Sequence, residues 1–165
     1  MTADLPPIVT EQPRDAPLVD ALIDRAFGPG RYTKTAERLR EGNHPLRDIC
    51  FVARRGGAVV GCVRMWPIRI GETPAVLLGP FAVGDAWRSL GLGAALIRRA
   101  CEAAATAGHA LVLLVGDDPY YGPLGFRRAP RTVVLPGPVD AARVLICELG
   151  SGAATDLGGL VRPDP

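Results

Sequence analysis

The chain has 165 residues, of which 48% are apolar and 22% are charged, and its formal net charge is +2. This length suits a single domain, spanning residues 1–165, with enough chain to bury a core, and the composition is that of an ordinary globular protein. So small a net charge gives no support for a nucleic-acid or membrane partner, and we expect neither.

The four cysteines, Cys50, Cys62, Cys101 and Cys147, are far apart and lie in apolar runs. There is no C-x-x-C pair and no histidine cluster, so we expect buried reduced thiols and no metal site. The N-terminal residues lack the basic start and apolar core of a signal peptide, and no run of about 18 apolar residues occurs. We therefore expect a cytoplasmic protein.

The first part of the chain predicts one short strand and two helices. A strand is expected at Ile8 to Glu11, and Asp15 then offers a helix N-cap. Apolar residues follow at helical spacing, at Leu18, Leu22, Ile23 and Phe27. The sequence GPG at 28–30 ends this helix, and a more polar helix is expected from about Thr33 to Arg40.

The pattern then changes to that of an antiparallel meander. Strands are expected at Ile49 to Arg54, Val59 to Ile70 and Ala75 to Val83, with turns at 55–57 and 71–74. Pro80 cannot donate a hydrogen bond to a neighbouring strand. It therefore predicts an irregularity or bulge in the middle of the third of these strands.

A helix and a buried strand follow the meander. From Leu92 the apolar face runs through Leu96, Ala100 and Ala104, and Gly108 ends the helix. Residues 109–115 form the strand, which the right-handed crossover rule places parallel to and beside strand 75–83. The fold class is thus α/β.

The last part of the chain is patterned more weakly. Residues 116–126 predict a turn with about one turn of helix, and β-like runs follow at Thr132 to Leu135 and Arg143 to Leu149. The tail from Gly150 carries little pattern.

The turn before the helix reads Arg88-Ser89-Leu90-Gly91-Leu92-Gly93. The first N–H groups of a helix lack intrahelical partners and attract phosphate, provided that side chains leave room. A dinucleotide-binding loop would need glycine at Leu96, and a Walker A loop would need a lysine. The loop alone is a weak signal, because two glycines also ease a tight strand-to-helix turn.

The stretch Leu77 to Phe126 combines this loop with the segment GDDPYYGPLGF and resembles the GCN5-related N-acetyltransferase (GNAT) family. The resemblance covers about residues 8–149 and leaves 150–165 as a C-terminal tail. It implies a mixed, mostly antiparallel sheet with flanking helices, in which two parallel strands splay apart at the cofactor slot.

The resemblance also implies acetyl-CoA as co-substrate. Its diphosphate would bind the backbone N–H groups of Arg88, Ser89, Leu90, Gly91, Leu92 and Gly93, and its pantetheine arm would pair with Phe81, Ala82 and Val83. The chain departs from the usual family pattern at Ser89 and Leu90. It also has Asp117 and Asp118 where an asparagine is common.

Acetyl transfer needs a neutral amine, a donor for the developing oxyanion and a proton for the departing thiolate. By resemblance, Tyr121 is the candidate acid, and a backbone N–H near 81–83 is the candidate oxyanion donor. A phenol of reference pKa ~10 is protonated at neutral pH and can donate. Tyr120 is expected to pack, and His109 and His44 are expected to have no catalytic role. The base stays open among water and five carboxylates: Glu72, Asp85, Asp117, Asp118 and Glu148.

The resemblance implies an acetyl-CoA-dependent N-acetyltransferase that acts on a primary amine by direct transfer in a ternary complex. The alternative is a catalytically inactive acyl-CoA-binding sensor or interaction module, and a nucleotide-binding protein of Rossmann type is disfavoured by Leu96. A small-molecule amine is expected as acceptor and a protein amine is possible. A homodimer is plausible by family habit.

Overall fold

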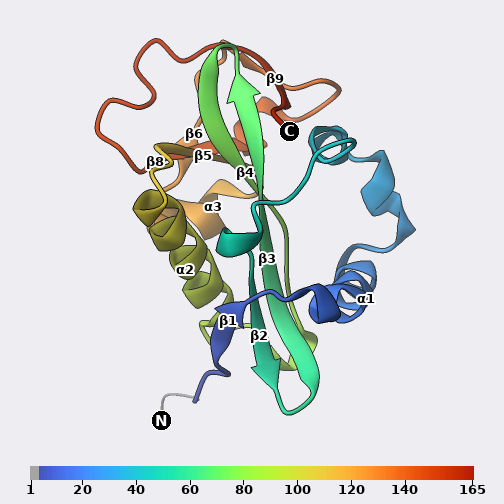
Figure 1. The fold of residues 1–165 in the computed structure, drawn as a ribbon. Coiled ribbons are helices and arrows are strands. Elements are labelled where there is room, and N and C mark those ends of the chain that lie inside the picture. The colour runs from blue at the N-terminus through green and yellow to red at the C-terminus, as the bar shows by residue number, and fades with distance from the viewer. Residues whose placement is uncertain (1–3) are drawn as a thin grey trace.

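A computed structural model describes residues 4–165 of the chain (Figure 1). Over these residues it has three α-helices: α1 (Ala16–Phe27), α2 (Leu92–Thr106) and α3 (Asp118–Tyr121). The same residues contain nine strands: β1 (Ile8–Thr10), β2 (Phe51–Arg55), β3 (Ala58–Ile70), β4 (Thr73–Val83), β5 (Leu111–Val115), β6 (Arg127–Arg128), β7 (Val133–Val134), β8 (Val144–Glu148) and β9 (Gly159–Pro163).

The strands form one mixed sheet in the order β1-β2-β3-β4-β5-β8-β6, and β9 joins the far end of β3 and also pairs with β7. The pairs β4/β5 and β7/β9 are parallel, and the other pairs are antiparallel. This confirms the predicted fold class. Helix α2 connects β4 to β5, so the expected crossover and its parallel neighbours are present.

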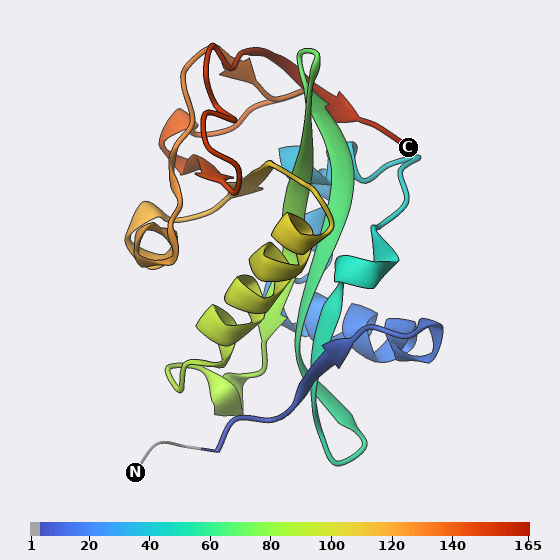
Figure 2. The same cartoon turned by 60° about the vertical axis from the view of Figure 1, so that its left-hand side comes forward.

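The helices α1 and α2 cover opposite faces of the sheet (Figures 1 and 2). On the α2 face, the predicted apolar stripe of Leu92, Leu96, Ala100 and Ala104 is fully buried against β2, β3 and β4. On the other face, called here the α1 face, helix α1 covers one end of the sheet. The other end is covered by Leu39, residues 133–135 and the tail.

Strand β4 contains the predicted bulge. Phe81 pairs with Val63 of β3 but Leu78 pairs with Met65, so β4 has one residue more than β3 between these pairs, and the Gly79–Pro80 peptide there is cis. Side chains alternate between the faces of a strand, so one extra residue reverses the alternation. Phe81 consequently joins Leu78 on the α2 face, and Ala82 packs against α1 on the other.

The helix expected at about Thr33 to Arg40 is absent. Residues 33–40 do not form an α-helix but two 3₁₀ helices, Pro29–Thr33 and Thr35–Leu39, with Lys34 extended between them. The segment buries only Thr35 and Leu39, too little for an amphipathic helix, and its two threonines favour helix weakly. The tail, which carried little pattern, supplies strand β9, and its Leu157 and Val161 are buried.

Asp15 precedes α1 as expected, but its side chain does not cap that helix. Its carboxylate instead accepts the Gln12 N–H at 2.7 Å and pairs with Arg54. Burial alone would raise the pKa of Asp15, but these two donors lower it overall. The Asp15 carboxylate therefore connects the start of α1 to strand β2 and does not cap the helix.

All four cysteines are free, as expected, but only Cys50 and Cys62 are buried, whereas Cys101 and Cys147 are half-buried. In the part of the chain that the structure describes, no helix is both long and apolar enough to cross a membrane.

Candidate active site

A cavity of about 900 Å³ passes from one face of the sheet to the other. Strands β4 and β5 pair only at Val76–Val112 and Leu77–Leu113, although β4 continues to Val83. Beyond Leu77 the β5-facing edge of β4 therefore borders a gap. Phe81, Ala82 and Val83, the residues expected to pair with pantetheine, line this cavity.

The loop before α2 lies at one end of the cavity and has an unusual backbone. Ser89 and Gly91 both have positive φ, at 63° and 90°, and a Cβ on Gly91 would meet open space. The first bond of the helix runs from the Ala95 N–H to the Gly91 carbonyl. The N–H groups between these residues are therefore free of intrahelical acceptors.

The predicted loop residues differ in their surroundings. Arg88, Ser89, Gly91 and Gly93 line the cavity, and Arg88 is exposed and pairs with Asp85 at 3.3 Å. Leu90 is exposed away from the cavity wall, and Leu92 is buried in the core. Neither leucine lines the cavity.

Gly93 is a glycine for a reason that differs from the expected one. The sequence suggested that a missing side chain leaves room for phosphate, but Gly93 is buried. A Cβ there would collide with the Tyr120 hydroxyl and would lie 3.1 Å from the Phe81 ring. Gly93 therefore lets α2 approach the aromatic side chains, and Gly91 is the glycine that the loop conformation requires.

Tyr121, the predicted acid, lines the cavity at the end of β5. Its ring packs edge-on against Tyr120, Phe81 and Phe126, with centroid separations of 4.8, 6.5 and 6.0 Å. A Cβ on Gly116 would overlap the Tyr121 ring, so this glycine provides the space for it. Burial raises the pKa of Tyr121 to about 12, with smaller contributions from Tyr120 and Asp117, so the phenol is protonated at neutral pH.

Tyr120 was expected only to pack. It does contact Phe81 and Tyr121, but it is also 47% exposed and forms part of the cavity wall. The two neighbouring tyrosines therefore both face the site.

The five carboxylates left open as bases do not converge on Tyr121. Each is paired with an arginine: Glu72 with Arg162, Asp85 with Arg88, Asp117 with Arg143, Asp118 with Arg128 and Glu148 with Arg127. Of the five only Asp117 lines the cavity. Neither histidine belongs to the lining.

On the α1 face the cavity is lined by residues that the sequence did not identify. Arg31, Lys34 and Arg40 line it, together with Pro138 and Val139 from the loop before β8. The Thr35 hydroxyl donates to the Pro138 carbonyl and joins these two segments. The sequence held no signal for this wall, because its parts are about a hundred residues apart and neither forms an α-helix or a strand.

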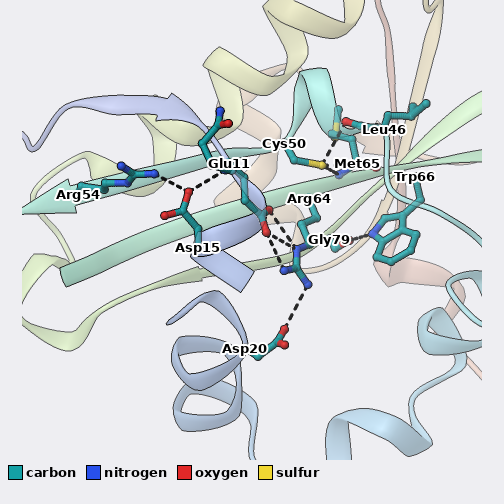
Figure 3. A network of polar contacts seen from close by, with 11 residues as sticks. Glu11, Asp15, Asp20, Leu46, Cys50, Arg54, Arg64, Met65, Trp66 and Gly79 are labelled. Atoms are coloured by element: carbon teal, nitrogen blue, oxygen red, sulfur yellow. Dashed lines mark hydrogen bonds and ion pairs between the residues drawn. The ribbon is translucent and has the colours of Figure 1, made fainter. Parts of the chain in front are cut away.

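Polar contacts hold β3 and β4 in place beside this wall (Figure 3). The Trp66 indole donates to the Gly79 carbonyl at 2.6 Å, directly at the bulge. On the same face of β3, Arg64 bonds Glu11 at 2.7 Å and Asp20 of α1 at 3.3 Å. These contacts hold β4 next to the point beyond which it no longer pairs with β5.

Comparison with known proteins agrees with this arrangement. Residues 17–126 match the sequence profile described as "Acetyltransferase (GNAT) family". Over 124 residues, 74% of either chain, the protein is 32% identical to the uncharacterized N-acetyltransferase YhbS of Escherichia coli strain K12. The chain belongs to the GNAT acetyltransferase family.

Two solved GNAT structures extend the likeness to the whole fold. The crystal structure of E. coli YhbS in complex with CoA has a TM-score of 0.79 and 26% identity, covering 99% of this chain and 93% of that one. A GNAT family acetyltransferase from Brucella melitensis in complex with acetyl-CoA has a TM-score of 0.69 and 24% identity, covering 96% and 95%. The family inferred from Leu77 to Phe126 is thus confirmed, and with it the class of enzyme.

Proposed function

We propose that this GNAT protein transfers the acetyl group of acetyl-CoA directly to a primary amine, with both substrates bound together. The observation that carries the proposal is the continuous cavity. It joins the loop before α2, the β4 edge and Tyr121 on one side to the wall of residues 31–40 and 138–140 on the other. YhbS, the similar protein crystallised with CoA, supports the choice of cofactor.

The residues at the loop fit a diphosphate. Positive φ at Ser89 and Gly91 turns the backbone at the start of a 15-residue helix, and no Cβ stands over Gly91. Free N–H groups at a helix N-terminus favour phosphate oxygens. The free edge of β4 offers further backbone donors and acceptors. The amides of a pantetheine arm could hydrogen-bond to this edge as a neighbouring strand would.

Acetyl-CoA would supply a thioester carbonyl as the electrophile. The acceptor nitrogen forms a bond to the carbonyl carbon while the carbon–sulfur bond breaks. Tyr121 gives its proton to the sulfur and regains one from solvent, and the nitrogen releases one proton. Because the pKa of the phenol is about 12, Tyr121 holds the proton at every pH at which the reaction would be assayed.

The acceptor is a small molecule in this proposal. The wall formed by residues 31–40 and 138–140 lines the far end of the cavity, and the volume of the whole cavity lies within the range of small-molecule sites. The ammonium proton leaves to water, since the one lining carboxylate among the candidates, Asp117, is bonded to Arg143.

The first test is a calorimetric titration with acetyl-CoA, followed by thiol release with a panel of primary amines. Gly91→Ala and Gly42→Ala form a matched pair, because both positions have positive φ and open space at the Cβ, but only Gly91 lines the cavity. Gly91→Ala should weaken acetyl-CoA binding by about tenfold, because the free loop of the variant would leave the binding conformation to relieve ~1.4 kcal/mol of backbone strain. Gly42→Ala should leave binding unchanged.

Absence of acetyl-CoA binding would overturn the proposal. Binding without transfer to any amine would favour the alternative, an inactive acyl-CoA-binding protein.

A further inference from the structure

We infer that the acceptor amine carries a carboxylate and that Arg40 binds this carboxylate. The inference rests on the proposed function and adds the chemical class of the acceptor. It is drawn from the wall of the cavity on the α1 face, opposite the loop that fits the diphosphate.

Arg40 has a largely buried side chain with donors to spare. Its side chain is 12% exposed, and its Nε donates to Glu37 at 3.1 Å. Nη1 lies 3.5 Å from the point where a Cβ on Gly79 would stand, so the group lies over the bulge of β4. Within residues 4–165 the two terminal amino groups donate to no protein acceptor, and Arg40 forms part of the cavity wall.

The positive charges around Arg40 would be stabilised by a bound anion. Arg31, Lys34 and Arg40 line this end of the cavity, and Asp140 is the one acidic residue on the same wall. Asp24, outside the lining, pairs with Arg31 at 2.9 Å. Arg31 also lies close enough to Arg40 to disfavour its charge. A buried positive group is costly unless it is paired, and Glu37 reaches only one of its nitrogens.

The two acidic residues that line the cavity, Asp117 and Asp140, are not bonded to Arg40. Asp117 is bonded to Arg143, and Asp140 accepts the Ala142 N–H. An anion on the acceptor itself would complete the site.

A carboxylate suits this guanidinium in shape. Two parallel N–H donors of an arginine match the two oxygens of a carboxylate, whereas a lysine presents a single point charge. The spacing also fits. Gly79 and Phe81 are two residues apart, at most about 7 Å along a strand. A carboxylate held over Gly79 therefore keeps a nearby amine within reach of the β4 edge at 81–83.

The test compares pairs of acceptors that differ only in the carboxylate, such as phenylalanine with phenethylamine and leucine with isoamylamine. The panel covers the standard amino acids, β-alanine and γ-aminobutyrate, with kcat/KM measured by release of CoA thiol. For the best acceptor, the acid should exceed its decarboxylated partner by roughly 10- to 100-fold, the range for a hydrogen bond to a charged group.

Arg40→Gln should bring this ratio close to one, and Arg40→Lys should give an intermediate ratio. Arg38→Gln is the matched control, because Arg38 belongs to the same segment and carries the same charge but is exposed and outside the cavity wall. It should keep the parent ratio. Acetyl-CoA affinity and melting temperature, measured for each variant, separate loss of the carboxylate contact from loss of the fold.

A ratio near one in the parent protein, or an equal ratio in Arg40→Gln and the parent, would overturn the inference and leave the proposed function standing. Transfer to none of the amino acids by a protein that binds acetyl-CoA would overturn it as well. Failure to bind acetyl-CoA would count instead against the proposed function.

Discussion

Replacing Gly93 with alanine should destabilise the protein, and removing the hydroxyl of Tyr120 should restore most of the loss. An added Cβ would collide with the Tyr120 oxygen and would lie 3.1 Å from Phe81 Cζ and 3.5 Å from Val83 Cγ2. Tyr120 is 47% exposed, so it can swing outward. It would then lose its contacts with the rings of Tyr121 and Phe81, whose centroids lie 4.8 and 6.4 Å away.

The expected magnitude follows from these contacts. Each aromatic pair contributes about 0.5–1.5 kcal/mol, so the displacement costs about 1–3 kcal/mol. Alanine recovers up to ~1 kcal/mol through its better helix propensity. We therefore expect Gly93→Ala to lower the free energy of unfolding by about 1 kcal/mol, within a range of about 0–2 kcal/mol.

Urea unfolding of Gly93→Ala, Tyr120→Phe and the double variant measures the coupling between the two positions. Tyr120→Phe alone should change stability by less than ~0.5 kcal/mol, and it should recover most of the loss in the Gly93→Ala background. Gly57→Ala, where a Cβ meets open space, is the control and should be nearly neutral. Additive effects of the two substitutions would refute the stated reason for glycine at position 93.

Two other substitutions and one labelling experiment have definite expected outcomes. Ser89→Gly should raise the free energy of unfolding by about 0.5–1 kcal/mol, because Ser89 has φ of 63° and glycine avoids the strain. Glu11→Gln should lower it by about 3 kcal/mol, because it leaves the Arg64 guanidinium, 15% exposed, without its main partner. The Cys62 thiol should resist alkylation at pH 8 until the protein unfolds, because burial raises its pKa to about 12 and it is therefore protonated at that pH.

Each of these three predictions has an outcome that would contradict it, and each of the two substitutions has a control. Ser151→Gly, at an exposed turn position whose φ is not positive, should lower stability where Ser89→Gly raises it, and the same sign at both sites would count against strain at Ser89. Glu72→Gln, which breaks an exposed pair, should cost less than ~1 kcal/mol, and an equal cost for Glu11→Gln would contradict its burial. For Cys62, rapid labelling of the folded protein, mapped by mass spectrometry, would contradict a buried thiol.

Local patterns in the sequence predicted the elements that position the cofactor side of the site. The apolar stripe from Leu92 to Ala104 set the buried face of α2, and the crossover rule placed β5 beside β4. Pro80 marked the bulge because a proline cannot take part in a regular ladder. In each case a few neighbouring residues carry the physical cause.

What the sequence did not predict depends on contacts between distant residues. Strand β9 has few apolar residues of its own and pairs with Ile68 to Ile70, about ninety positions earlier. Arg40 reaches the cavity only because Leu39 is buried and Thr35 bonds Pro138. The reason for glycine at position 93 is likewise a tyrosine hydroxyl that arrives from α3. No local pattern encodes such approaches.

The most direct measurement of the proposed chemistry is the kcat of Tyr121→Phe, with the dissociation constant of acetyl-CoA determined on the same preparation. We predict that kcat falls by about 10²- to 10⁴-fold, the contribution of a positioned proton donor. The dissociation constant should stay within about threefold of the parent value, because the ring and its aromatic contacts remain. An unchanged kcat in a variant that still binds acetyl-CoA would contradict the role given to the Tyr121 phenol.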